Sequence, residues 1–441
     1  MIVIKFGGSS VADREQIDKV AQIIKQREGQ RLFIVCSAHK GVTSQLIESA
    51  QQAAQGNLDV ASALRVQRQV CASLECPESH LSHLYDELEA LLRGISLVRE
   101  LSSRTLDYVA SFGERMSVRA IAWYLRQQGI AAAEFDAWDL GLITDSKFGQ
   151  ARPLDSYLYE IPKRIREIGE AIPIVTGFIG KDLNGNITTL GRNGSDLSAT
   201  LFAEALEADS CEIWSDTNGV MSADPGLIPD AQNIPQMSYR EASELARFGS
   251  RVLHPASLEP VARAGIPLKV MNTNSPDHHG TLVSHEVNRD RQSITSIAYK
   301  ENQTIITITS SEMFQRSGFL AEVFAVLARH DVVVDVISTS EISLSFSTED
   351  NERLNLALHT LSSLGKCQVV SGKTIIAIVG HDHRCFLRHE IDVLTVLRSQ
   401  DIDAEMLSLG YESINLLILI DNRFISKAVS SLHNSFFKHV E

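Results

Sequence analysis

An apolar pentapeptide that runs straight into a glycine pair limits the fold of this chain more than any other feature. Ile2-Val-Ile-Lys-Phe6 predicts a buried strand, and Gly7-Gly8 predicts a tight turn directly after it. Asp13 and Gln16 have the spacing of a helix cap, and apolar residues then recur at helical spacing before a second apolar run, Leu32–Val35. A strand, a helix and a strand in this order predict a parallel sheet of the α/β class.

Strand-like and helix-like segments continue to alternate up to about residue 287. Residues 58–129 have a helical pattern with a leucine stripe that we expect to be core. Short apolar runs predict strands at Ile172–Val175, Glu212–Trp214 and Pro267–Val270. The segments Ser195–Ala208 and Tyr239–Phe248 between them predict helices. We therefore predict one α/β domain over residues 1–287, with a mostly parallel sheet between helices.

The remaining residues contain an internal repeat. A shift of 70 positions, with no gap, places Ile305-Ile306 on Ile375-Ile376 and Asp331 on Asp401. Each copy has the pattern strand, helix, strand, strand, so we predict two ferredoxin-like βαββ modules, over residues 300–372 and 373–441. Their joint interface could hold a ligand, and the alternative interpretation is an arm that serves only dimerisation.

Charge and cysteine content exclude several classes of function. The 441 residues carry a net charge of −14, which disfavours binding to nucleic acid or to an anionic membrane. The 6 cysteines form no CxxC pair, and neither a signal peptide nor a membrane-spanning run is found. We expect a soluble cytoplasmic protein with reduced thiols that acts on small molecules.

Two glycine-rich loops could bind phosphate. In the first, Gly7 and Gly8 allow backbone N–H groups to approach an anion, and Lys5 adds a positive charge beside them. The second, Thr188–Asp196, opens a helix and carries Arg192, which can bind a carboxylate, and Asp196, which could orient a lysine. Neither the Walker A nor the GxGxxG pattern occurs. The alternatives are an ordinary tight turn for the first loop and a helix cap with a solvated arginine for the second.

Two further segments complete the set. The segment Trp214–Pro225 begins at a strand end, where ligands collect in open α/β sheets, although it could also be a plain loop. Glu114 is expected in a short break between helical stretches, as a substrate ligand or a solvated carboxylate. No Cys/His or Ser/His/Asp arrangement accompanies these groups. Phosphoryl transfer needs positioning and charge neutralisation, with Mg2+ bridging the nucleotide oxygens, so a small-molecule kinase fits best.

Motifs along nearly the whole chain resemble those of aspartate kinases, in the family's order. They are Lys5–Val11, Ser37–Thr43, Ser111–Glu114, Thr189–Asp196, Trp214–Asp216 and Phe248–Pro255. The C-terminal segments Ser317–Phe324 and Val334–Glu341 resemble the ACT modules of the monofunctional, lysine-inhibited members. The resemblance implies ATP-dependent phosphorylation of the side chain of L-aspartate to 4-phospho-L-aspartate, with Mg2+, in the pathway to lysine, threonine and methionine.

The resemblance also implies roles for particular residues. Lys5 and Asp196 would be catalytic, and Thr43, Glu114, Arg192 and Ser195 would bind aspartate. The nucleotide would contact Lys5, Gly7, Gly8, Ser9, Ser215, Asp216, Met221 and Arg251. Inhibitory L-lysine would contact Met313, Ser317, Gly318, Phe319, Leu320, Val334, Asp335, Ser340 and Glu341. The ACT modules would join the chains into a homodimer or a dimer of dimers.

Several positions depart from the family pattern. Ser9 replaces a Thr, Asn193 stands where Gly is common, and Met221, Gly226 and Arg251 differ on the nucleotide side. These changes keep open a different class of function, an amino-acid-sensing ACT protein on a kinase fold with weak catalysis. A kinase acting on glutamate is the alternative among enzymes.

The histidine cluster His381, His383, Cys385 and His389 imitates a metal site. No second cluster with suitable spacing accompanies it, so we expect surface histidines and no protein-bound metal.

Overall fold

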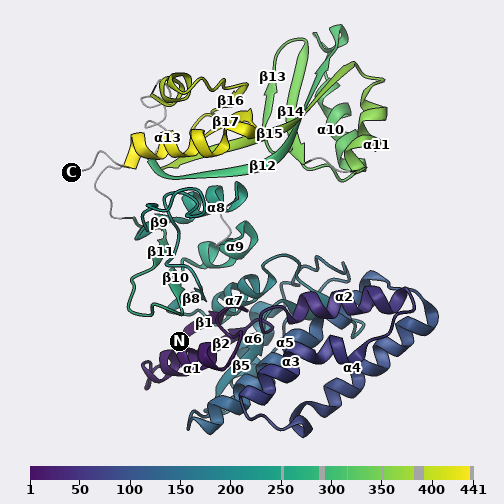
Figure 1. The fold of residues 1–441 in the computed structure, drawn as a ribbon, viewed down its shortest axis with the longest axis vertical. Helices are drawn as coiled ribbons and strands as arrows, with labels where there is room; N and C mark the ends of the chain where they lie inside the picture. Colours follow the sequence, from purple (N-terminus) through teal and green to yellow (C-terminus); the bar gives the residue numbers. More distant parts are fainter. Residues whose placement is uncertain (250–252, 288–293, 315, 350–351, 382–391, 438–441) are drawn as a thin grey trace. The chain divides into compact units, whose positions relative to one another are not determined.

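The chain forms two compact units. The computed structural model describes residues 1–249, 253–287, 294–314, 316–349, 352–381 and 392–437. The first unit comprises Met1–Val220, Asn233–Ala242 and Val252–Val287. The second comprises Met221–Gln232, Ser243–Arg251 and Asn288–Glu441. Figure 1 shows the elements of each unit.

An eight-stranded sheet organises the first unit. Its strands, in spatial order, are β3 (Ala132–Phe135), β5 (Ile172–Thr176), β2 (Leu32–Cys36), β1 (Ile2–Phe6), β8 (Ser210–Ser215), β10 (Leu268–Asn272), β11 (Thr281–Ser284) and β9 (Gln236–Ser238). The pairing of β10 with β11 is antiparallel, and the other neighbours are parallel. The predicted mostly parallel α/β sheet is thus confirmed. A smaller sheet contains β4 (Ile143–Thr144), β6 (Ile179–Asp182) and β7 (Ile187–Thr189).

Helix α1 (Arg14–Lys25) follows β1 as predicted. Asp13 caps it by accepting a hydrogen bond from the Gln16 backbone N–H at 3.0 Å, and its apolar residues are buried. The other helices of this unit are α6 (Tyr157–Ile165), α7 (Gly194–Ala205) and α9 (Pro255–Ala264), and α8 (Tyr239–Arg247) contributes its first residues. None of the helices that the structure describes is long and apolar enough to cross a membrane.

The long helical region divides into separate helices that pack on one another (Figure 1). They are α2 (Val42–Ala54), α3 (Val60–Ser73), α4 (Glu78–Val98) and α5 (Ser103–Gln127). The leucine stripe is buried along α4, as expected. The expected break around Glu114 is wrong, because Glu114 lies inside the continuous α5. Phe112 and Met116 on either side of it are fully buried, so packing sustains the helix through Gly113.

The second unit contains one six-stranded sheet. Its spatial order is β13 (Ile337–Thr339), β14 (Ser343–Glu349), β12 (Ile294–Thr309), β15 (Lys366–Gly380), β17 (Asn415–Asp421) and β16 (Met406–Ser408). Its helical segments are η1 (Ser311–Met313), α10 (Phe319–Arg329), α11 (Glu352–Leu361), residues 392–399, η2 (Asn422–Phe424) and α13 (Ile425–Phe437).

The backbone repeats at the spacing that the sequence predicts. Asp331 and Asp401 both adopt a left-handed conformation, with φ of 52° and 57°, directly after the first helix of each copy. Asn302 and Gly372, with φ of 57° and 76°, likewise take equivalent positions within the long strands β12 and β15, where the register of their pairing shifts. Each copy also ends in a helix, α11 or α13, which the predicted strand–helix–strand–strand pattern lacks.

The long strands β12 and β15 join the two copies. The later part of β12, residues 305–309, pairs with residues 366–370 of β15, within the first copy. The earlier part, residues 294–300, pairs with residues 375–380, the first strand of the second copy. The division into modules at 300–372 and 373–441 stays a prediction. The pairing shows that residues 294–299, which precede the first predicted module, add a strand segment beside the second.

Each copy has its own apolar core. In the first, strand residues such as Ile306 and Phe346 pack with α10 and α11 residues that include Phe319 and Leu361. In the second, β15 and β17 pack against α13 through residues such as Leu432. The two copies are therefore separate packing units built on one sheet.

Candidate active site

The carboxyl ends of three neighbouring parallel strands position the candidate site. β1 lies between β2 and β8, with Lys5 opposite Val35 on one side and Ile213 on the other. The chain leaves β1, β2 and β8 at the same edge, so the loops after these strands meet there. Ligands bind at such an edge where the chain order reverses, as it does on the two sides of β1.

Lys5 and Asp196 form a buried ion pair at this edge. Lys5 Nζ lies 2.6 Å from Asp196 Oδ1, and the two side chains are 11% and 7% exposed. Lys5 comes from β1 and Asp196 from the first turn of α7, so the pair joins the two glycine-rich loops. Removing one partner would leave a buried charge uncompensated, which costs about 3–5 kcal/mol.

The glycine pair is required by close packing. The Gly7 N–H donates to the Trp214 carbonyl at 3.0 Å, which holds the loop against β8. A Cβ on Gly7 would lie 3.3 Å from Lys5 Nζ, and one on Gly8 would lie 3.0 Å from the Ala38 carbonyl oxygen. Larger residues would therefore push against the lysine and against the loop after β2.

The start of α7 is organised around Asp196. Asn193 has a left-handed backbone, with φ of 55°, and its Nδ2 donates to Asp196 Oδ2 at 3.5 Å. Glycine tolerates this conformation best, and asparagine is among the few other residues that adopt it readily. The alternative interpretation of Asp196 or Ser195 as a helix cap is wrong, because the cap position is Asn193 and makes no side-chain cap bond.

Two other residues of this loop were predicted to bind substrate. Arg192 is exposed, and within the described residues its guanidinium forms no ion pair. Ser195 is 8% exposed and packs against Gly177, where an added Cβ would lie 2.7 Å from Ser195 Oγ. Arg192 is thus available to a ligand carboxylate, and Ser195 lines the junction with β5.

Glu114 is a buried carboxyl with one oxygen available. Its Oε1 accepts a hydrogen bond from the Ala38 N–H at 3.2 Å, and its Oε2 has no hydrogen-bond partner among the described residues. Burial raises the pKa of Glu114 to about 8. A Cβ on Gly113 would lie 2.9 Å from Ala38 Cβ and 3.2 Å from Thr43 Oγ1, so α5 packs directly on the start of α2.

Sequence reasoning missed two buried polar residues beside this site. Asp107 Oδ2 accepts from the N–H groups of Gly149 and Thr189, at 2.9 and 2.8 Å, and so ties the second glycine-rich loop to α5. His39 Nδ1 contacts the Val11 carbonyl oxygen, and burial lowers the pKa of this imidazole to about 4. Asp107 lies two helical turns before Glu114, a spacing that could have pointed to it.

The predicted nucleotide residues are divided between the two compact units. Ser215 is the last residue of β8, and Asp216 follows it, at the edge that carries Lys5. Ser9 is half-buried in the first loop. Met221 belongs to the second compact unit, where its carbonyl accepts a hydrogen bond from Ser296 Oγ at 2.9 Å. Arg251 lies outside the described residues.

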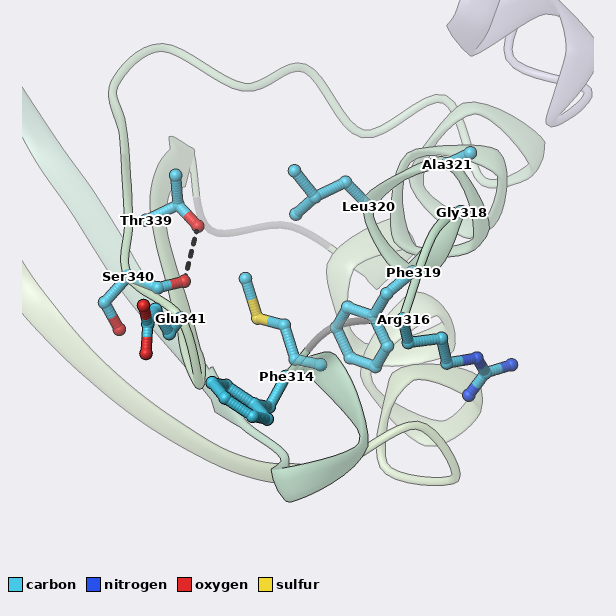
Figure 2. A pocket seen from close by; sticks show the side chains of 10 residues that line it. Phe314, Arg316, Gly318, Phe319, Leu320, Ala321, Thr339, Ser340 and Glu341 are labelled. Carbon is cyan, nitrogen blue, oxygen red and sulfur yellow. Dashed lines mark hydrogen bonds between the residues drawn. The ribbon is translucent and has the colours of Figure 1, made fainter.

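A cavity of about 610 Å³ opens beside α10 in the second unit. Its lining includes six predicted effector residues, Met313, Gly318, Phe319, Leu320, Ser340 and Glu341, together with Phe314, Arg316, Ala321 and Thr339. Figure 2 shows Phe319 and Leu320 on one side of the cavity and Ser340 and Glu341 on the other. Gly318, with φ of 88°, precedes α10 without a side-chain cap, so helix N–H groups can donate hydrogen bonds to a ligand carboxylate.

The other predicted effector residues do not line this cavity. Asp335 Oδ2 lies 2.7 Å from Lys300 Nζ, so its carboxylate is already paired. Ser317 and Val334 are likewise absent from the lining. Arg316, which lines the cavity, pairs with Glu312 and Glu322, each at 2.8 Å.

The candidate metal cluster is not tested. His383, Cys385 and His389 lie outside the described residues, and His381 is exposed. Within the part of the chain that is described, no group of three or more His, Cys, Asp or Glu could hold a metal ion.

Comparison with known proteins identifies the family of this chain. Residues 1–272 match the amino acid kinase family, and residues 306–363 match the ACT domain. The chain is 34% identical to Aspartokinase 2 of Arabidopsis thaliana, over 99% of this chain and 84% of the relative. It is also 34% identical to the lysine-sensitive aspartokinase 3 of Escherichia coli, over 99% of both chains.

Solved structures show the same relationship. The E. coli aspartokinase III structure with aspartate and ADP matches with a TM-score of 0.87 and 32% identity, over 99% of this chain and 100% of the other. The same enzyme with lysine and aspartate matches with a TM-score of 0.79 and 31% identity, over 99% of each chain. The chain therefore belongs to the amino acid kinase family and, within it, to the aspartokinases, phosphotransferases that act on the carboxyl group of aspartate.

Proposed function

We propose that this chain transfers the γ-phosphoryl group of ATP to the side-chain carboxylate of L-aspartate and that L-lysine inhibits the reaction through the ACT region. The observation that carries the catalytic part is the buried Lys5–Asp196 ion pair between two glycine-rich loops. Such a pair places one positive charge where phosphate oxygens gather, which is the principal requirement of phosphoryl transfer.

The chemistry needs no general base. The aspartate side chain is ionised at neutral pH, so its oxygen can attack the γ-phosphorus directly. A new P–O bond forms to aspartate as the bond to the bridging β–γ oxygen breaks, and ADP leaves. Lys5 would neutralise charge on the transferring group, and Asp196 would hold the Lys5 ammonium in place.

Three groups are assigned to the binding of aspartate. Glu114 Oε2, buried and without a partner among the described residues, would accept a hydrogen bond from the substrate ammonium. Arg192, exposed at the second loop, would bind the α-carboxylate through paired N–H bonds. Thr43 and Ser195 would complete the site, since Thr43 lies against Gly113 and Ser195 lies beside Gly177.

The nucleotide would lie along the first loop, with its phosphates at Gly7, Gly8 and Ser9 and its other contacts at Ser215 and Asp216. Mg2+ would bind nucleotide oxygens and water, because the Asp196 carboxylate is already paired with Lys5. Mg2+ would supply charge neutralisation on the phosphates. Met221 and Arg251 are retained as nucleotide contacts of the same proposal.

Inhibition by lysine is assigned to the cavity beside α10. The N–H groups that follow Gly318 would bind the lysine carboxylate, and Glu341 would bind an ammonium group. The E. coli aspartokinase III complex with lysine and aspartate is a T-state structure, which supports an inhibitory role for lysine in this family. We further propose a cytoplasmic homodimer, or a dimer of dimers, joined through the ACT region.

Trapping of the acyl phosphate with hydroxylamine tests this function. The purified chain is incubated with ATP, Mg2+ and either aspartate or glutamate, with and without lysine. We expect a hydroxamate from aspartate, at least about 100-fold less from glutamate, and suppression by lysine. Product from glutamate at equal rates would make the chain a kinase of broader specificity. No product, together with calorimetric binding of lysine, would make it an amino-acid sensor.

A further inference from the structure

Two cysteines meet where helix α3 ends. The Glu75 backbone is left-handed, with φ of 56°, its N–H donates to the Ala72 carbonyl, and the Cys76 N–H donates to the Cys71 carbonyl at 2.9 Å. These two bonds define a Schellman motif, which brings together the side chains of the residues joined by its longer bond. Apolar residues commonly occupy those two positions, and here both are cysteines.

The thiol of Cys71 is surrounded by hydrogen-bond donors. Gln67 Nε2 donates to Cys71 Sγ at 3.3 Å, and Tyr85 Oη donates to it at 3.7 Å. The Cys76 thiol donates to the Pro77 carbonyl oxygen at 3.9 Å and remains a protonated neighbour of the Cys71 thiol. Gln67 is fully buried, and its Oε1 has no partner among the described residues. Such donors favour the thiolate form of Cys71, because a thiolate accepts hydrogen bonds more strongly than a neutral thiol does.

The two thiols are consequently different. The neighbouring Cys76 thiol and the donors Gln67 and Tyr85 lower the pKa of the Cys71 thiol against the opposing effect of burial. The neighbouring Cys71 thiol, together with burial, raises the pKa of Cys76. A thiolate beside a protonated thiol is the arrangement of a nucleophilic cysteine and its resolving partner.

The other buried cysteines of the described chain lack this arrangement. Cys36 in β2 and Cys211 in β8 are both fully buried, and burial raises the pKa of each thiol. Each lies within the central sheet, with no second cysteine hydrogen-bonded to it. The end of α3 is thus distinguished by the presence of two sulfur atoms and by the donors directed at one of them.

We propose that Cys71 and Cys76 form a reversible thiol–disulfide site that reacts with hydroperoxides. The Cys71 thiolate attacks the peroxide, an S–O bond forms, the O–O bond breaks, and hydroxide leaves with the electron pair. The Cys76 thiol gives its proton to the hydroxide, and its sulfur then displaces a second hydroxide from the sulfenic acid, which leaves as water after protonation. In sum, two thiols and one hydrogen peroxide give one disulfide and two waters.

The site lies on an element that contacts α1. Arg14, the first residue of α1, donates to the Ser73 carbonyl and pairs with Glu75, each at 2.9 Å. The turn that carries Cys71 and Cys76 is therefore attached to α1, the helix that follows the first glycine-rich loop. Transient disulfides of this kind are compatible with a reducing compartment, where a small dithiol can reverse them by exchange.

Peptide mapping of the full-length protein tests the proposal. The folded chain is treated with hydrogen peroxide, the peroxide is removed, the chain is unfolded in denaturant so that iodoacetamide blocks every remaining thiol, and the protein is digested with trypsin. The peptide Gln69–Arg93 contains both cysteines and no others. We expect this peptide to appear unalkylated and lighter by two hydrogen atoms, and to regain both alkylation sites after dithiothreitol. The peptide that contains Cys36 should remain alkylated and is the internal control.

Two variants examine the assigned roles. In Cys76→Ser, sulfenic acid at Cys71 should persist and be trapped by dimedone, whereas Cys367→Ser, at a half-buried cysteine elsewhere, should form the disulfide at the normal rate. The proposal would be overturned if Gln69–Arg93 stayed doubly alkylated at peroxide concentrations that oxidise Cys367, or if either cysteine bonded to a different one. Peptide mapping of the chain without substitutions tests the proposal even if a variant fails to fold.

Discussion

The two candidate sites differ in how much of their chemistry is assembled before a ligand arrives. At the edge of the parallel sheet, Lys5 and Asp196 are already paired at 2.6 Å and nearly buried. In the cavity beside α10, Leu320 is 38% exposed and Phe314 is 50% exposed. Preorganised charges in a dry site contribute more per group than groups that a ligand must order. Single substitutions should therefore cost far more at the first site than at the second.

The largest effect is expected at Lys5. Lys5→Ala removes the only side-chain charge that we assign to the transferring phosphoryl group, so kcat/KM should fall by about 10³-fold or more. The matched control is Lys19→Ala, because Lys19 pairs with Glu15 on the exposed side of α1 and should not affect turnover. Far-UV circular dichroism checks the fold of both variants. Near-normal rates for Lys5→Ala would contradict its proposed role.

Arg192→Ala should chiefly weaken the binding of aspartate. Loss of paired hydrogen bonds to a carboxylate predicts a rise of about 100-fold in the KM for aspartate, with a smaller change in kcat. Arg166→Ala, at an exposed arginine at the end of α6, should leave both constants unchanged. If Arg192→Ala lowered kcat alone, Arg192 would act on the transition state and not on the bound substrate.

Glu114 predicts a pH dependence with a definite sign. Its pKa of about 8 keeps the free carboxyl largely protonated at neutral pH, while the substrate ammonium favours the ionised form. The KM for aspartate should therefore fall as pH rises from about 6.5 to about 8.5. Glu114→Gln should weaken aspartate binding and lose this dependence, which steady-state kinetics across the pH range would detect.

Glu114 affects stability and substrate binding in opposite directions, because a rise in pH strengthens aspartate binding but weakens the contribution of Glu114 to folding. Because burial raises the pKa of Glu114 from 4.5 to about 8, the folded state binds more protons than the unfolded state between these values. The contribution of Glu114 to the free energy of unfolding should fall as pH rises through this interval. Denaturant unfolding of Glu114→Gln should show a flatter pH profile than the parent chain, and an equal slope would contradict the raised pKa.

The smallest effect is expected in the cavity beside α10. Glu341→Ala should spare turnover and raise the lysine concentration for half-inhibition by about 10-fold, within the usual range of coupling between sites. Glu352→Ala, an exposed carboxylate in the first turn of α11, is the control and should leave inhibition unchanged. If Glu341→Ala lost turnover, the proposal that Glu341 acts only in regulation would be contradicted.

The sequence predicts most of the fold because the decisive signals are local. The run Ile2–Phe6 with its glycine pair specifies the strand and turn, and the repeat specifies two similar modules. The pairing of residues 294–300 with 375–380 could not be predicted, because it joins segments about eighty residues apart and depends on sheet register. The closing helices α11 and α13 were missed because the repeat was interpreted only as far as its last strand.

The candidate active site, like the fold, could be predicted from the sequence only where its signals are local. The glycine loops and their charged residues stand out as motifs, and the structure pairs Lys5 with Asp196 as the resemblance to the family implies. Asp107 lies in no motif, and His39 lies in the motif Ser37–Thr43 with no role assigned to it. The importance of both residues comes from burial and from backbone partners distant in the sequence. Glu114 stands out by its motif but was wrongly placed in a break, since a glycine within α5 suggested an interruption that packing overrides.

Reciprocal binding tests the coupling of the two sites most directly. Calorimetric titration of lysine into the full-length chain is carried out alone and in the presence of saturating aspartate with ADP and Mg2+. Linkage requires that, if lysine weakens substrate binding, the substrates weaken lysine binding by the same factor. The account predicts a lysine dissociation constant that rises about 5-fold or more with the substrates present. A constant that does not change, with lysine still bound, would contradict the claim that the ACT region regulates the catalytic site.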